Sequence, residues 1–137
     1  MDSLAALREK IPSFPGYREE GDRRLSGELV RSYLGEALAD LRDRLEPLPP
    51  ELETSIDDAI VNVGFVNQQT WHVFEDAART VTSFDALAAA DEDVLRVAGD
   101  AAAVDVRSLA AYLDEVAATL DRRDATLRGY AAPASSN

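Results

Sequence analysis

Apolar residues recur at spacings of three and four along three long stretches of this 137-residue chain. That spacing places side chains on one face of an α-helix, whereas a half-buried β-strand alternates apolar and polar residues. The stretches cover residues 18–46, 51–82 and 91–128, and no stretch alternates as a strand would. The sequence therefore predicts an all-α protein. Its apolar stripes include, in chain order, Val30, Leu34, Leu41, Ile56, Ile60, Val63, Leu109, Leu113 and Leu120.

Prolines divide the chain into these segments. The sequence PLPP at 47–50 ends the first long segment, and Pro50 suits the first turn of the next helix. Residues 3–10 predict a short helix, capped by Asp2 or Ser3 and stopped before Pro12. In the following loop, PSFPGY, we expect Phe14 and Tyr17 to hold the chain against the end of the bundle.

The expected architecture is an antiparallel bundle of three long helices, at about 18–46, 51–82 and 91–128, preceded by a short N-terminal helix or arm. The predicted organisation is a short helix and loop at 1–16, the bundle at 17–130 and a flexible tail at 131–137. An alternative is an extended helical hairpin that completes its core by dimerising, in the manner of a coiled coil.

The charge of the chain limits its partners. Twenty-six acidic residues face fourteen basic ones, for a net charge of −12, and Lys10 is the only lysine. Such a charge disfavours binding to nucleic acid and adsorption to anionic membranes. The absence of cysteine excludes disulfides and thiolate metal sites, and neither a signal peptide nor a membrane span is indicated. These features predict a cytoplasmic protein.

Two resemblances accompany these patterns. The opening FPGYREEGDRR, followed by a leucine-rich helix, resembles the start of a group of small helical prokaryotic proteins to which no function is assigned. This resemblance implies a helical fold and no activity. The acidic, arginine-rich and lysine-poor composition resembles that of proteins from salt-loving archaea. A GC-rich genome would also favour arginine over lysine. An acidic surface could instead serve a specific basic partner.

No pattern of catalytic or metal-binding residues is present, so we expect no enzyme, no cofactor and no metal. His72 is the only histidine, and Glu75 and Asp76 follow it at helical spacing, which is too few ligands for a tight metal site. The sequence DED at 91–93 is expected at a helix N-terminus or on a solvated face. The pairs Arg23-Arg24 and Arg122-Arg123 are expected to form salt bridges.

The stretch GFVNQQTWHVFED, residues 64–76, contains the candidate functional residues. On one continuous helix, Asn67 would lie within the core stripe and could fix the register or the oligomeric state. Trp71 would lie at the edge of that stripe and Phe74 within it, where they could border a pocket. A second apolar line, formed by Val61, Phe65 and His72, would lie on another side and is the candidate interface.

The sequence thus favours a non-enzymatic helical protein that acts through protein–protein contacts in a high-salt cytoplasm, as a homo-oligomeric assembly element or a small adaptor. The alternative is a regulatory or binding module that holds a small apolar ligand near Trp71 and Phe74. If another helix of the chain covers the second apolar line, Phe65 is ordinary core. If another subunit covers it, Phe65 belongs to an interface.

Overall fold

The computed structural model describes residues 2–131, and all regular structure in that range is helical, with no β-strand. The expectation of an all-α protein is confirmed. The helices, in chain order, are α1 (Ser3–Lys10), α2 (Glu20–Leu45), α3 (Pro50–Val63), α4 (Gln68–Ala78), α5 (Asp85–Asp100), a 3₁₀ turn (Ala101–Ala103) and α6 (Leu109–Ala131).

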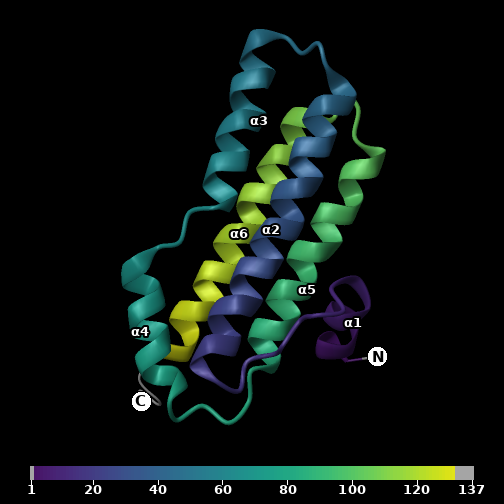
Figure 1. Ribbon diagram of the computed structural model, residues 1–137. Helices are drawn as coiled ribbons and strands as arrows, with labels where there is room; N and C mark the ends of the chain where they lie inside the picture. The colour runs from purple at the N-terminus through teal and green to yellow at the C-terminus, as the bar shows by residue number, and fades with distance from the viewer. Residues whose placement is uncertain (1, 132–137) are drawn as a thin grey trace.

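The helices pack as a bundle in which two shorter helices, α3 and α4, follow one another along the same side (Figure 1). Helix α5 lies against both α2 and α6, while α3 packs between α2 and α6 on the other side. Helix α4 continues beyond α3 along the end of α6, and α1 packs on the outside of α5. The expectation of three long helices is therefore wrong, because only α2 forms over the predicted length.

The first break divides the segment predicted as one helix at 51–82. Helix α3 ends at Val63, with Gly64 as its C-cap, and α4 begins only after Asn67. The Asn67 side chain accepts a hydrogen bond from the Thr70 backbone N–H at 3.0 Å, which caps the new helix. We call residues 64–67 the elbow. The apolar period continues through the elbow, so the period alone could not reveal the break.

The second break divides the segment predicted at 91–128. After α5 and the 3₁₀ turn, Asp105 and Ser108 exchange side-chain-to-backbone hydrogen bonds of 2.9 and 3.0 Å. Such local bonds compete with the helical pattern and start α6 afresh. Arg44, at the end of α2, donates to the carbonyl oxygens of Ala101 and Val104, both at 2.9 Å. This contact ties the turn after α5 to the end of α2.

The N-terminal part follows the prediction closely. The Asp2 carboxylate accepts from the Ala5 backbone N–H at 2.8 Å and caps α1. In the loop that follows, Phe14 and Tyr17 are buried, as expected. Gly16 has a φ of +93°, a conformation that side-chain-bearing residues rarely adopt. Its carbonyl oxygen accepts from the Ser26 hydroxyl at 2.6 Å, which ties the loop to α2.

The core is continuous from one end of the bundle to the other. Its largest fully enclosed side chains are Leu7, Phe14, Leu34, Leu38, Leu41, Ile56, Phe74, Leu87, Leu95 and Leu109. Of the predicted tail, only Ala131 is described, and it ends α6; residues 132–137 lie outside the described range. Over residues 2–131, no helix combines the length and apolar character needed to cross a bilayer.

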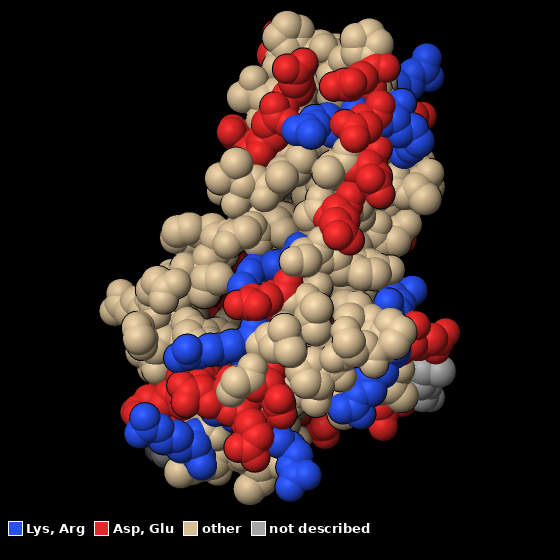
Figure 2. Space-filling model, in the orientation of Figure 1, with Lys and Arg blue, Asp and Glu red and all other residues tan. Residues whose placement is uncertain are grey.

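Acidic side chains occur along the whole length of the face shown in Figure 2, with basic side chains between them. Most ion pairs among the described residues are solvent-exposed, and such pairs contribute little stability each. The net charge of −12 should therefore destabilise the compact state in dilute buffer.

We expect the melting temperature to rise as sodium chloride is increased from about 0.05 M to about 1 M, because the screening length falls to roughly 3 Å. A gain of about 1 kcal/mol corresponds to roughly 4 °C for a chain of this size, and we expect at least that shift in thermal circular dichroism. A melting temperature that does not change with salt would show that repulsion between the acidic residues contributes little to the stability of the fold. A rise that begins only above about 1 M would indicate salting-out instead.

Candidate functional site

The elbow places two large apolar side chains in solvent. Val61, in the last turn of α3, is 72% exposed, and Phe65, in the elbow itself, is 73% exposed. No helix within residues 2–131 covers them, so Phe65 is not core. His72 is also exposed but belongs to α4, beyond the break. The continuous line of Val61, Phe65 and His72 expected on one helix is therefore interrupted between Phe65 and His72.

The three residues proposed for register or a pocket have separate roles. Asn67 is exposed and caps α4, so its predicted place in the core stripe is wrong. Phe74 is fully buried, and its ring centroid lies 5.1 Å from that of the half-buried Trp71. The rings of Tyr130 and Phe84 lie 5.7 and 6.4 Å from Phe74. Phe74 is thus the centre of an aromatic cluster.

A polar network adjoins this cluster, through Tyr17 and Arg23 against Phe84, and joins the N-terminal loop to α2, α4, α5 and α6. Asp91 is completely buried, contrary to the expectation that DED at 91–93 would be solvated. Its carboxylate forms an ion pair with the Nε of Arg123 and accepts from the Tyr17 hydroxyl at 2.7 Å. Burial, followed by the charge of Asp91, raises the pKa of Tyr17 far above its ordinary value, so the hydroxyl remains a donor.

A second arginine extends the network. The Arg23 Nε donates to Glu75 at 2.8 Å, and its Nη1 donates to the backbone carbonyls of Tyr17 and Arg18. Arg24 pairs with Glu20 and Arg122 with Glu115. The salt-bridging expected of both arginine pairs is therefore confirmed. What the sequence did not reveal is that one member of each pair is buried.

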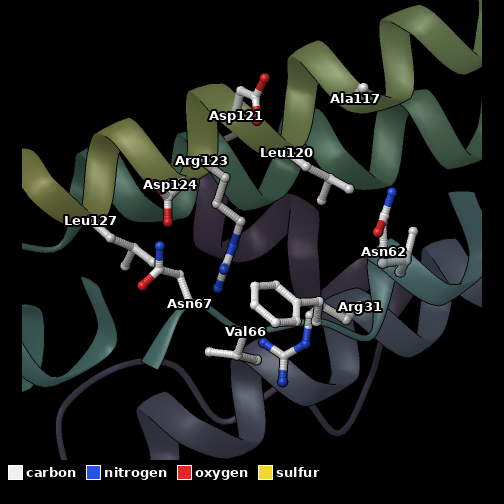
Figure 3. A pocket seen from close by; sticks show the side chains of 12 residues that line it. Arg31, Asn62, Val66, Asn67, Ala117, Leu120, Asp121, Arg123, Asp124 and Leu127 are labelled. Atoms are coloured by element: carbon white, nitrogen blue, oxygen red, sulfur yellow. The ribbon is translucent and has the colours of Figure 1, made fainter. Parts of the chain in front are cut away.

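A hollow of about 320 Å³ opens between α2, the elbow and α6 (Figure 3). Arg31 reaches it from α2 and Arg123 from α6, and their guanidinium groups extend into the same space, with Asn67 at its edge. We use the term hollow for the space lined by Arg31, Asn62, Val63, Phe65, Val66, Asn67, Ala117, Leu120, Asp121, Arg123, Asp124 and Leu127.

The two arginines of the hollow differ in their surroundings. Burial lowers the pKa of Arg123, but the adjacent Asp91 carboxylate outweighs it and leaves that pKa above the ordinary value. Burial also lowers the pKa of the half-buried Arg31, and the positive charge of Arg123 lowers it further. Arg31 takes part in no ion pair or side-chain hydrogen bond within residues 2–131. No pattern in the sequence indicates that Arg31 and Arg123 converge, since they are 92 positions apart.

The carboxylates next to His72 are engaged elsewhere. Glu75 bonds to Arg23, and Asp76 lies 3.5 Å from Arg79. Among residues 2–131, no group of three or more histidine, cysteine or acidic side chains is arranged to hold a metal ion. The geometry around His72 thus offers a single exposed imidazole.

Comparison with known proteins returned no match to a family model, to a curated protein or to a solved structure. The resemblance of the FPGY opening to small helical prokaryotic proteins therefore remains an expectation.

Proposed function

We propose that this chain is a non-enzymatic helical protein that acts through protein–protein contact in a salt-rich cytoplasm, and that the elbow binds a second copy of the chain. One observation carries the proposal. Val61 and Phe65 are more than 70% exposed and lie within the longest uncharged stretch of the sequence, residues 59–74. An exposed apolar surface of this kind is typical of an interaction site.

The charge distribution favours a second copy as the partner. Two chains that each carry −12 repel one another wherever acidic surfaces meet, and they approach most easily at an uncharged surface. Residues 59–74 provide such a surface around the end of α3, the elbow and the first turns of α4. In a twofold dimer the same patch serves both partners, so one uncharged patch is sufficient.

The competing function, an apolar ligand held near Trp71 and Phe74, has less support. Phe74 is enclosed by aromatic rings, so a ligand there would have to displace the cluster. The depression beside Trp71 is lined by charged side chains, among them Arg24, Glu28 and Arg31. Neither environment suits an apolar molecule, because charged groups would lose solvation without gaining partners.

Replacing Phe65 with alanine should weaken self-association at least tenfold and leave the chain folded, because the ring contacts solvent and not the core. Multi-angle light scattering in about 2 M sodium chloride, where acidic repulsion is screened, would measure the mass as a function of protein concentration. The matched control is Leu25→Ala, since Leu25 is exposed on α2 outside the elbow. It should associate as the parent does.

Two results would contradict the proposal. A parent chain that stays monomeric at every salt and protein concentration would remove self-association as its function. An oligomer whose mass survives both Phe65→Ala and Val61→Asp would place the interface on another surface. Circular dichroism of each variant separates loss of association from loss of folding.

A further inference from the structure

The hollow behind the elbow contains an arginine, Arg31, that forms no ion pair among the described residues, so that Glu28 and Asp91 act on its charge only from a distance. Arg31 is half-buried, yet within residues 2–131 no carboxylate pairs with it and no carbonyl accepts from it. All five N–H groups of its guanidinium are therefore available. Every fully buried side-chain nitrogen or oxygen in that range has a partner, so these free donors are accessible to solvent. A half-buried cation without a partner is unusual in a chain this acidic.

Gly27 brings a second guanidinium to the same place. A Cβ at Gly27 would lie 3.2 Å from the Nη1 of Arg31 and 3.4 Å from the Nη2 of Arg123. The two groups thus converge over the bare backbone of α2. Only the Nε of Arg123 is used by Asp91, which leaves the terminal N–H groups of Arg123 without an acceptor among the described residues. The hollow therefore presents N–H donors from two arginines that have no acceptor among the described residues.

The remaining lining is amphipathic. Val66, Leu120 and Leu127 provide apolar walls together with Phe65 and Val63, and Asn62 and Asn67 add amide groups. Two acidic residues of α6 also line the hollow. Asp124 is paired with Arg128 at 2.6 Å, and the Asp121 side chain extends from the outer side of α6, away from the two arginines (Figure 3).

We propose that the hollow binds a carboxylate carried on a small apolar body, with Arg31 and the terminal N–H groups of Arg123 holding the carboxylate and the apolar walls holding the body. A planar guanidinium matches a carboxylate through two parallel hydrogen bonds. The volume of about 320 Å³ lies within the range of small-molecule sites. This proposal does not depend on the elbow contact.

A monocarboxylate fits better than a phosphate dianion. Because Asp91 is already paired with Arg123, Arg31 is the guanidinium of the hollow that has no ion-pair partner among residues 2–131. Asp124 lines the hollow and, although it is paired with Arg128, disfavours a second negative charge on the ligand. Inorganic phosphate has no apolar part that could contact the apolar walls.

The test is a titration of the full chain with phenylacetate, followed by nuclear magnetic resonance of the backbone amides and arginine Nε–H groups. We expect saturable shifts at Arg31, Val66, Asn67 and Leu127, with a dissociation constant on the order of 1 mM for a ligand of this size. Phenylacetamide, which has nearly the same shape without the charge, should bind at least tenfold more weakly. Inorganic phosphate should cause no saturable shift at these residues.

Variants assign the binding to the two guanidinium groups. Arg31→Gln should weaken phenylacetate binding at least tenfold, whereas Arg122→Gln, on the exposed side of α6, should leave it unchanged. Gly27→Ala provides an independent variant that should keep the fold, because alanine favours helix and the Arg31 terminus can move aside. Its methyl group would separate the two guanidinium groups and weaken binding.

Three results would overturn the proposal. One is equal binding of phenylacetate and phenylacetamide, which would make the hollow an apolar pocket only. Another is phenylacetate binding that survives both Arg31→Gln and Gly27→Ala. The third is a set of shifts at the same residues that depends on protein concentration without any ligand, because the carboxylate would then come from another copy of the chain. Val61→Asp distinguishes this site from the elbow contact, because Val61 does not line the hollow. We expect this variant to lose self-association and to bind phenylacetate as the parent does.

Discussion

Replacing Asp91 with alanine is expected to lower the free energy of unfolding by about 3 to 5 kcal/mol, because the variant leaves the Arg123 charge buried without a partner. The Tyr17 hydroxyl would lose its acceptor at the same time. The loss should extend across the molecule, since this network joins the N-terminal loop to α5 and α6. Urea unfolding at a fixed, high salt concentration would measure it.

The matched control lies two residues along the same helix. Asp93 is partly exposed and pairs only with Arg96, at 3.4 Å, so Asp93→Ala should change stability by no more than about 0.5 kcal/mol. Asp91→Asn, which keeps the shape and an acceptor oxygen but removes the charge, should fall between the two. If Asp91→Ala and Asp93→Ala had equal stability, the buried network would contribute nothing to the fold.

Phe74→Ala is expected to destabilise the chain by about 3 to 5 kcal/mol, the range for removing a buried aromatic ring. The ring contacts Trp71, Phe84 and Tyr130, so its loss would leave a cavity at the junction of α4 and α6. The near-ultraviolet circular dichroism of Trp71, the only tryptophan, should weaken as well.

Phe65→Ala is the matched control, because it removes the same ring from an exposed position nine residues earlier. We expect it to change the stability of the monomer by no more than about 0.5 kcal/mol. If Phe65→Ala destabilised the monomer as much as Phe74→Ala, the elbow would have to pack against the bundle in solution. That result would contradict the exposure on which the proposed contact rests.

The class of fold could be predicted because helical periodicity is a local property. Spacings of three and four place Val30, Leu34 and Leu41 on one face of α2, and all three are buried. The start of α3 at Pro50 and the cap of α1 by Asp2 are equally local, since each depends on residues within one turn. Such features require no knowledge of the neighbouring helices.

The helix breaks were missed because the apolar period continues across them. Val63 and Val66 keep the stripe in phase through the elbow, although the backbone leaves the helix between them. Gly64 and Asn67 are the signals that could have revealed the break, as a helix end followed by a new N-cap. Asp105 and Ser108 are the corresponding signals before α6. In both places a hydrogen bond between a side chain and the backbone starts a new helix, although the helical spacing of apolar residues continues.

By itself the sequence determined the helical class, the ends set by proline and the acidic character of the surface, because each depends on composition or on residues close together in the chain. Only the tertiary structure decided that Asp91 is buried while Asp93 is partly exposed, although both stand in one acidic run. It also decided that Arg31 and Arg123 meet over Gly27. These outcomes depend on which helices become neighbours, and that choice is made by packing between segments far apart in the chain.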